Sequence, residues 1–167
     1  EITRIYGYDN FDIHTTSTPV YPVRPAVEKT MEEKIKDILV KRFSLHEMHS
    51  YVWMYYDECK DLGIEIEDNI KLVNATNPNI EVIRKSIVPT QLCQAKINNT
   101  YAPSFGIFEV GRVVEGLRED GLCNERKKLA ITLFSKTKSM QEIYFELRDI
   151  LATLALDLKH LSLSYET

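Results

Sequence analysis

Two histidines and one acid lie close together in this chain, in a pattern that superficially suggests a zinc site. His46, Glu47 and His49 fall within four residues, and imidazole and carboxylate groups are common zinc ligands. A zinc-binding helix spaces its histidines four apart, whereas these are three apart in a segment rich in β formers. Residues an odd number apart on a strand point to opposite faces. We therefore expect both histidines to be structural.

Other patterns that carry chemistry are missing from the sequence. Neither a Walker loop nor Gly-x-Gly-x-x-Gly occurs, which excludes phosphate binding of those kinds. Gly106 and Gly111 flank Ile-Phe-Glu-Val, and glycines within a strand usually mark bulges or close packing. His14 and His160 stand alone, and no Ser-His-Asp or Cys-His set is indicated. We expect no catalytic residue in this chain.

The charge balance bears on possible partners. The net charge is −4, whereas a protein that binds nucleic acid by itself normally carries a basic stripe that neutralises phosphates. The one basic cluster, Arg126-Lys127-Lys128, opens an apolar stretch and is typical of a solvated strand end. We expect no binding to DNA, and we expect any RNA contact to lie mostly elsewhere.

Length and composition indicate one globular domain in a reducing compartment. A chain of 167 residues with 28% charged and 44% hydrophobic residues can bury a core without disulfides or metals. Its three cysteines, Cys59, Cys93 and Cys123, form no Cys-x-x-Cys pair and suit reduced thiols. No apolar run approaches the ~18 residues that span a bilayer. We predict a cytoplasmic protein without membrane contact, and the absence of an initial methionine indicates a fragment of a longer chain.

The first half of the sequence mixes a helix with short strands. Residues 1–6 read as the last turn of a helix, with Gly7 in the left-handed position that ends it. Residues 8–24 are linker-like, and we place a domain boundary between 1–24 and 25–167. A helix is expected from Pro25 to Phe43, on the apolar stripe of Val27, Met31, Ile35, Ile38 and Leu39. A strand over 46–53, a helix over 54–62 stopped by Gly63, and a strand over 70–73 follow.

The second half contains the clearest elements. A helix over 90–98 has Pro89 in its first turn, and strands over 105–115 and 128–134 form a pair whose connection contains Asp120-Gly121. Ser139 and Glu142 form a capping box ahead of apolar residues at three- and four-residue steps. The alternation of Leu161, Leu163 and Tyr165 predicts a last strand. Strands joined by hairpins indicate an α+β fold with an antiparallel sheet flanked by helices.

Four stretches of the sequence, taken in order, resemble one protein family. They are Arg4-Ile5-Tyr6-Gly7-Tyr8-Asp9-Asn10, the segment from Asn77-Pro78-Asn79 to Val88-Pro89, Phe108-Glu109-Val110-Gly111-Arg112, and Ile143-Tyr144-Phe145-Glu146-Leu147-Arg148-Asp149. The family is the β subunit of bacterial-type phenylalanyl-tRNA synthetase, and the likeness spans nearly the whole chain. It covers the end of one internal domain and most of the catalytic-like domain after it. The sequence departs from the family pattern at Asn74-Ala75-Thr76 and at Lys85.

The resemblance implies the fold of a class II aminoacyl-tRNA synthetase core that has lost its catalytic groups. Class II activation of an amino acid needs a cation at the α-phosphate, where charge develops in the transition state. Catalytic subunits of this family supply arginines from a strand-loop motif and from a glycine-rich motif, and this chain lacks the glycine-rich one. Arg84 and Arg112 are the only arginines in suggestive places. We expect Arg84 to orient its loop through carbonyls and Arg112 to be exposed.

The same resemblance gives a metal-binding role to one residue. Glu1 matches the second of two adjacent glutamates that, with upstream aspartates, are assigned to magnesium in the family. The other ligands are missing from this sequence. Because a hard cation needs several carboxylates or waters, we expect Glu1 alone to hold no metal.

The implied function is structural. The chain is expected to support the α subunit of phenylalanine–tRNA ligase, which joins phenylalanine to its tRNA with ATP and magnesium in an (αβ)2 enzyme, while the fragment itself binds neither cofactor. The first long helix, 26–43, and the strand with Tyr51 and Trp53 are candidate contacts with the α subunit. The alternatives are a non-enzymatic interaction module of an unrelated assembly and, less favoured by the absent glycine-rich motif, an autonomous ATP-using ligase.

Overall fold

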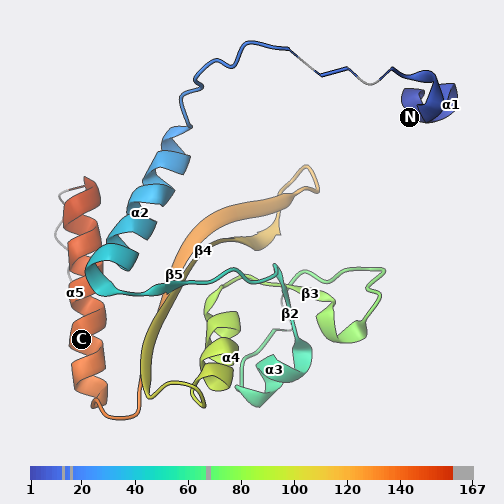
Figure 1. Cartoon of the computed structure of the whole chain (residues 1–167). Helices are drawn as coiled ribbons and strands as arrows, with labels where there is room; N and C mark the ends of the chain where they lie inside the picture. Colours follow the sequence, from blue (N-terminus) through green and yellow to red (C-terminus); the bar gives the residue numbers. More distant parts are fainter. Residues whose placement is uncertain (13, 16, 67–68, 160–167) are drawn as a thin grey trace.

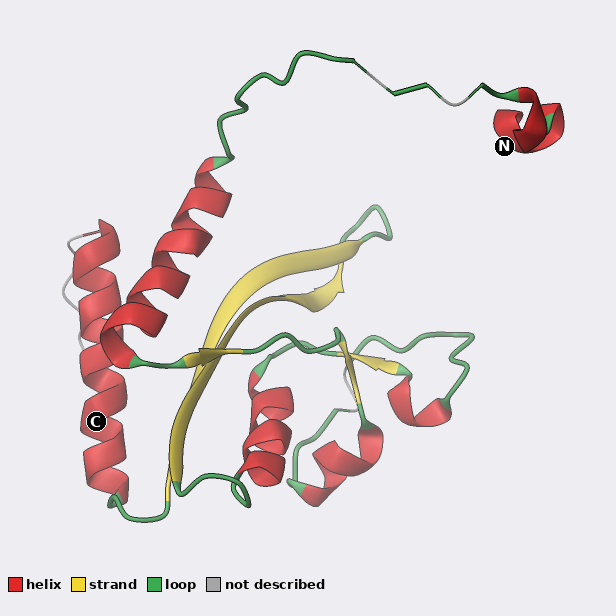
Figure 2. Ribbon diagram, viewed as in Figure 1, coloured by secondary structure: helices red, strands yellow, loops and turns green. Residues whose placement is uncertain are grey.

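A long antiparallel hairpin organises the molecule. The computed structural model describes residues 1–12, 14–15, 17–66 and 69–159. In Figure 1, two long helices lie along one side of the hairpin, while short helices and a second small sheet lie on the other side. Figure 2 shows the same mixture of helices and strands, which confirms the predicted α+β class.

The hairpin consists of β4 (Ser104–Leu117) and β5 (Cys123–Ser135). It contains the strand pair predicted from the sequence and is longer than predicted at both ends. Residues 118–122 connect the strands, where Gly121 has a φ of +80° and the Asp120 carboxylate accepts a hydrogen bond from the main-chain N–H of Leu122 at 3.0 Å. The positive φ explains why glycine follows the aspartate at this turn.

The other strands are short. β1 (His46–Glu47) pairs with β4, giving the sheet order β1-β4-β5, and β2 (Trp53–Met54) pairs antiparallel with β3 (Val82–Ile83). The hairpin is antiparallel as predicted. The β2–β3 pair is antiparallel too, although no strand was predicted at β3, and β1 runs parallel to β4, contrary to the antiparallel sheet that was predicted.

Two predicted strands are shorter than the sequence indicated. The strand predicted over 46–53 is divided because its main chain changes partner: the N–H of Met48 donates to Phe108, but the carbonyl of Val52 accepts from Arg84. In the strand predicted over 70–73, only Lys71 forms a bridge, to Val82.

Helices α2 (Val27–Phe43) and α5 (Met140–Lys159) cover one face of the hairpin. The capping box that opens α5 is confirmed: the Glu142 carboxylate accepts from the main-chain N–H of Ser139 at 2.7 Å, and the N–H of Glu142 donates to the Ser139 hydroxyl at 3.3 Å. Between the two helices and the sheet lies the main apolar core, whose fully buried members are Leu39, Leu45, Phe108, Ile150 and Leu154.

Shorter helices pack near the opposite face. α3 (Tyr56–Asp61) ends close to Gly63, whose φ of +67° confirms the predicted stop, and η2 (Pro78–Ile80) is capped by the side chain of Asn77. α4 (Val88–Asn98) begins two residues before its predicted start, with Pro89 in the first turn. A small core of Ile87, Val113 and Ala130 joins α4 to the hairpin, and a separate core contains Met54, Cys59, Ile66 and Val82.

The N-terminal elements lie away from the sheet in Figure 1. α1 (Ile2–Tyr6) and η1 (Tyr8–Asn10) meet at Gly7, whose φ of +95° is the positive value predicted there, although its ψ of 129° is not that of a left-handed helical residue. The described residues from 17 to 26 form neither helix nor strand and are exposed. The strand predicted around Leu161, Leu163 and Tyr165 lies outside the described residues.

Within the described part of the chain, no helix combines the length and the apolar character that crossing a membrane requires.

Candidate functional site

A ring of charged and polar side chains is buried on the hairpin face opposite α2 and α5. Arg84 is 1% exposed and Glu109 is 2% exposed. The guanidinium Nη2 of Arg84 donates to Glu109 Oε1 at 2.7 Å, and its Nη1 donates to the hydroxyl of Ser50 at 2.6 Å. That hydroxyl in turn donates to the second oxygen of Glu109 at 2.5 Å. The three side chains therefore close a hydrogen-bonded ring.

The ring ties three separate segments together. The Nε of Arg84 donates to the main-chain carbonyl of Arg112 at 3.0 Å, and the main chain of Arg84 pairs with Val52 on one side and with Val114 on the other. Arg84 thus joins the loop after β1 to the middle of β4. The expectation that it would orient its loop through carbonyls is confirmed for one contact, to a carbonyl of β4; the other two partners of the guanidinium are the Ser50 hydroxyl and the Glu109 carboxylate.

Gly111 leaves the space that the Arg84 guanidinium occupies. A methyl group at this position would lie 2.5 Å from Nη2 of Arg84 and 2.7 Å from Oε1 of Glu109. Real carbon atoms do not approach so closely, so a side chain here would displace the ion pair. The close packing expected at Gly111 is confirmed, and this glycine belongs to the same short motif as Glu109.

A second buried polar contact extends this face toward the end of the hairpin. Gln91 of α4 is fully buried and donates to the main-chain carbonyl of Ala130 at 3.1 Å. Its side-chain oxygen accepts from the hydroxyl of Thr132 at 2.7 Å. The amide therefore fixes α4 to β5 in one register.

Arg112, unlike Arg84, is exposed to solvent. Its side chain is 64% exposed and pairs with Glu125 on the neighbouring strand at 2.9 Å. The expectation that Arg112 is exposed is confirmed. It lies within β4, however, and does not end the strand.

The candidate metal ligands are dispersed. Glu1 precedes α1 with its side chain 84% exposed, and one of its carboxylate oxygens lies 4.0 Å from Nη1 of Arg4. His46 is in β1, whereas His49 follows that strand and lies 3.2 Å from the Glu47 carboxylate. Among the described residues, no three histidines, cysteines or acids gather in a group that could hold a metal ion.

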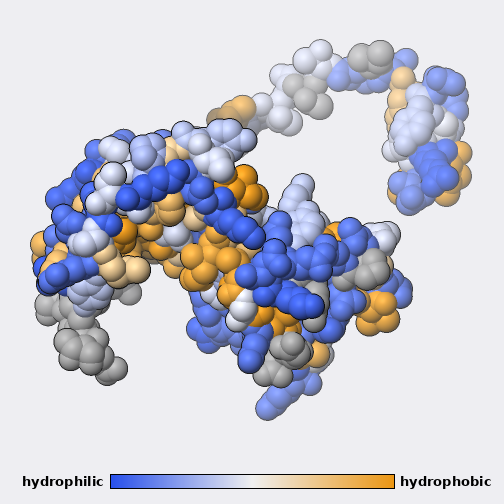
Figure 3. Space-filling view, turned by 90° about the horizontal axis from the view of Figure 1, so that it is seen from below, coloured by the Kyte–Doolittle hydropathy of each residue, from blue (hydrophilic) through white to orange (hydrophobic). Residues whose placement is uncertain are grey.

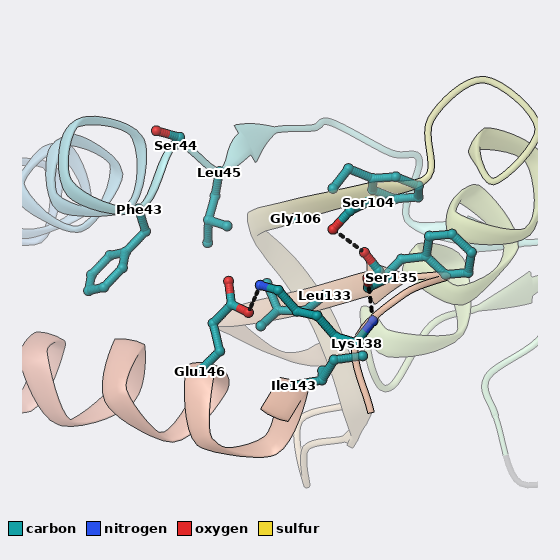
Figure 4. A pocket seen from close by; sticks show the side chains of 12 residues that line it. Phe43, Ser44, Leu45, Ser104, Gly106, Leu133, Ser135, Lys138, Ile143 and Glu146 are labelled. Carbon is teal, nitrogen blue, oxygen red and sulfur yellow. Dashed lines mark hydrogen bonds and ion pairs between the residues drawn. The ribbon is translucent and has the colours of Figure 1, made fainter. Parts of the chain in front are cut away.

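A small cavity of about 180 Å³ lies where α2 ends and α5 begins. Figure 4 shows Lys138 and Glu146 pointing toward one another across it, with Leu45 and Leu133 at its apolar side. Gly106 forms part of the wall, and a methyl group there would lie 2.2 Å from the Leu45 side chain. The ion pair between Lys138 and Glu146 crosses this cavity. Because these two side chains satisfy each other, the cavity is better explained by the packing of α2 and α5 on the sheet than by ligand binding.

The sequence also matches a family model described as the phenylalanyl tRNA synthetase beta chain CLM domain, over residues 14–167. The chain belongs to this family. The match includes both motifs that supply the buried ring, Arg84 in one and Glu109 with Gly111 in the other.

Curated relatives carry the same family name over most of this chain. The phenylalanine–tRNA ligase beta subunit of Leptospira interrogans is 27% identical over 141 residues, which are 84% of this chain and 17% of the relative. That of Leptospira biflexa is 25% identical over 164 residues, covering 93% of this chain and 20% of the relative. The CLM-domain chain therefore spans about a fifth of the length of these relatives.

Solved structures bear out the expected fold. Two structures of pyrrolysyl-tRNA synthetase from Desulfitobacterium hafniense superpose with TM-scores of 0.59 and 0.60, at 14% and 15% identity. Each superposition covers 79% of the chain and a little under half of the synthetase chain. The hairpin and its helices thus have the class II synthetase architecture.

Sequence reasoning missed most members of the buried ring. Arg84 was singled out, but its partners Ser50 and Glu109 were not. One signal was available: Glu109 is the only charged residue between Phe105 and Gly111, and an acid inside an apolar strand requires a partner. No local pattern identifies Ser50 or Gln91, because their partners are far away in the sequence.

Proposed function

We propose that this chain is a non-catalytic structural module of phenylalanine–tRNA ligase. As part of the β subunit, it would support an α subunit that joins phenylalanine to tRNA with ATP and magnesium. Membership of the CLM-domain family supports the assignment to the ligase. The observation that carries the structural role is the buried Arg84–Glu109 pair, which holds inside the fold an arginine that could otherwise serve chemistry.

A class II reaction requires a cation at the reacting phosphate. Charge develops on the α-phosphate as the carboxylate attacks, and a preorganised cation must meet it. Arg84 cannot do so because its guanidinium is enclosed and hydrogen-bonded to Glu109, Ser50 and a carbonyl. Arg112 is exposed and paired with Glu125. Neither arginine that the sequence offers is therefore placed to bind ATP.

The residues present do not fit a magnesium site. A hard divalent cation takes about six oxygen ligands, and Glu1 brings one carboxylate that faces Arg4. We propose that Glu1 serves as a magnesium ligand only when further carboxylates join it. Calorimetric titration of this chain with magnesium chloride should give no saturable heat. A saturable heat abolished by Glu1→Gln would show that Glu1 suffices.

The support for an α-subunit interface is apolar surface that the fold leaves uncovered. We propose a domain boundary between residues 1–24 and 25–167, and we place the docking surface in the domain formed by residues 25–167. The α2 stripe packs into the core through Ile35, Ile38 and Leu39. Val27 at the start of the stripe is 81% exposed, and Val40, which lies off the stripe, is 46% exposed. Figure 3 shows further apolar side chains at the surface between the part of the molecule that contains α2 and α5 and the part that contains α3 and α4.

The second candidate surface also has exposed apolar groups. Tyr51 is 67% exposed, and Val52 and Tyr55 beside it are about two-fifths exposed, at 39% and 42%. Obligate interfaces are large and apolar at their centre. Both surfaces remain proposed contacts, and α2 is the simpler one to test because its exposed positions lie on a single regular element.

The test introduces charge at the exposed apolar positions of α2 in the β subunit. Val27→Asp and Val40→Asp should abolish co-purification with a tagged α subunit and, with it, the charging of tRNA. Lys34→Glu, at an exposed polar position of the same helix, should leave both intact. Urea unfolding should show that all three variants are folded. Assembly and normal charging by both valine variants would remove this surface from the proposal.

A further inference from the structure

A cavity of about 390 Å³ lies between α3, α4 and the loop that follows β1. It adjoins the buried ring through Ser50, which is part of its wall. Its volume falls in the range of pockets that enclose small molecules, which are mostly apolar with a few placed polar groups. Tyr51 and Tyr55 of its wall also belong to the second candidate surface for the α subunit, but the interior of the cavity has no part in the structural role proposed above.

One wall of the cavity is aromatic. Tyr51 and Trp53 stack with ring centroids 4.9 Å apart and ring planes 10° apart. Both residues line the cavity, as do the methionines Met48 and Met54. Aromatic rings held in this way present a flat apolar surface on which the body of a ligand can pack, and thioether side chains adapt to the shape of an apolar group.

The helices α3 and α4 contribute polar atoms to the cavity wall. The Thr90 hydroxyl of α4 is buried and has no hydrogen-bond partner among the described residues. Glu58 of α3 also lines the cavity, and in the described part of the chain its carboxylate has no lysine, arginine or histidine nitrogen within 4.0 Å. A buried donor or acceptor without a partner is costly, so a ligand that satisfied Thr90 would gain affinity there.

The electrostatic character of the cavity is negative. Among the described residues, Glu58 and His49 line it, and no lysine or arginine does. Burial, followed by the charge of Glu58, raises the pKa of the Cys93 thiol in the wall to about 11. This thiol therefore stays neutral at physiological pH and is hydrogen-bonded to the Glu58 carboxylate, which keeps its negative charge beside the cavity. The arrangement favours a positively charged guest over a negatively charged one.

We propose that this cavity binds a small organic cation, an ammonium group carried on an aromatic or branched aliphatic body. The ammonium group lies between the Glu58 carboxylate and the Thr90 hydroxyl. The apolar body lies against Trp53 and the methionines. This is a binding function in addition to the structural role, and it requires no catalytic residue.

The chain contains one tryptophan, so intrinsic fluorescence reports directly on this cavity. Phenethylamine, which is protonated at neutral pH, should change the Trp53 emission saturably. 3-Phenylpropionate has the same aromatic body with a negative charge and should bind at least about tenfold more weakly, a difference of ~1.4 kcal/mol. Glu58→Gln should weaken phenethylamine binding by about the same factor, and Thr90→Val should weaken it less.

Glu119→Gln is the matched control, because it removes the same charge from an exposed residue of the hairpin loop; its affinity for phenethylamine should equal that of the wild type. Far-UV circular dichroism checks that the variants are folded. If Glu58→Gln does not fold, the comparison of amine and carboxylate on the wild-type chain decides. The proposal is overturned if phenethylamine gives no saturable change up to 20 mM, if the carboxylate binds equally well, or if folded Glu58→Gln binds as the wild type does.

Discussion

The two faces of the β4–β5 hairpin are held by different forces. On the face under α2 and α5, Phe108 packs among aliphatic side chains such as Leu39 and Ile150. The opposite face has a small apolar core of its own around Val113, and beside it the next residue along the strand, Glu109, is buried in an ion pair with Arg84. Successive residues of a strand point to opposite faces, so one strand supplies both environments. The two environments fix the chain differently. Apolar side chains can repack when one of them changes, whereas the hydrogen-bonded ring is broken when any one of its three side chains is lost.

In the described part of the chain, only the face with Arg84 and Glu109 has the buried charges that are typical of a functional site. A buried charge pair contributes little net stability but is costly to break, because the remaining charge has no solvent. Such pairs are sometimes retained because they fix one arrangement of the chain. Here the ring fixes the loop after β1 against β4 through Ser50, and Tyr51 of that loop forms the aromatic wall of the cavity together with Trp53 of β2.

The largest effect is expected from breaking the ring. Arg84→Met should destabilise the chain by about 3–5 kcal/mol, because Glu109 would be left charged and buried. Urea unfolding monitored by Trp53 fluorescence measures this loss. The double variant Arg84→Met with Glu109→Leu should recover a large part of it, and the cycle of variants measures the coupling. A loss below ~1 kcal/mol in the single variant would show that the ring does not hold this face.

The apolar face should respond through cavity formation alone. Ile150 of α5 is 1% exposed, and Ile150→Ala should cost about 2–5 kcal/mol. Leu147 of the same helix is only half-buried, so Leu147→Ala should cost less. Urea midpoints of the two variants give the comparison. Equal losses would mean that α5 does not pack through the Ile150 side of the helix.

A smaller effect is expected at the start of α5. Ser139→Ala removes the hydroxyl that accepts from the N–H of Glu142 and should cost ~1 kcal/mol. Ser139→Asp keeps an acceptor at the cap and serves as the control, with a urea midpoint close to that of the wild type. If both variants lost the same stability, the capping contact would not be the cause.

The smallest effect concerns a partly exposed ion pair between the first half of α2 and the first half of β5. Glu32 of α2 lies 2.7 Å from Lys127 of β5 and 3.0 Å from Lys36. The hydrogen bond from Lys127, and then that from Lys36, lower the pKa of Glu32 to about 2. Because Lys127 is 45% exposed and water screens such pairs, Glu32→Gln should cost at most about 1 kcal/mol at pH 7.

The pH dependence of this contribution has a definite sign. A carboxylate whose pKa is lowered on folding stabilises the folded state above its unfolded pKa of 4.5 and loses that effect as the pH falls toward 2. The urea midpoint of the wild type should therefore fall more between pH 5 and pH 2.5 than that of Glu32→Gln. Parallel curves would contradict the contribution of Glu32.

Local patterns in the sequence predicted the elements that depend on local contacts. The apolar steps and the capping box of α5, the Asp120-Gly121 turn and the paired strands depend on residues near one another in the chain. The strand predicted over 46–53 was wrong in extent. Its main chain pairs first with β4, at Met48, and then with Arg84, at Val52, and local periodicity does not encode this change of partner.

The candidate site was predictable only in part for the same reason. Arg84 was recognised as unusual, and Gly111 was expected to allow close packing. Their meeting point was not predictable, because Ser50, Arg84 and Glu109 are 25 to 59 residues apart in sequence. The cavity beside them also combines segments that are distant along the chain.

Phenylalanine-dependent exchange of pyrophosphate into ATP tests the central claim most directly. The claim is that Arg84 is committed to the fold and that the chain activates no amino acid. The pure chain should give exchange equal to a buffer control at every phenylalanine concentration, while a purified α–β ligase in the same assay gives a strong signal. Exchange by the chain alone that rises with phenylalanine and exceeds the buffer control would contradict the account.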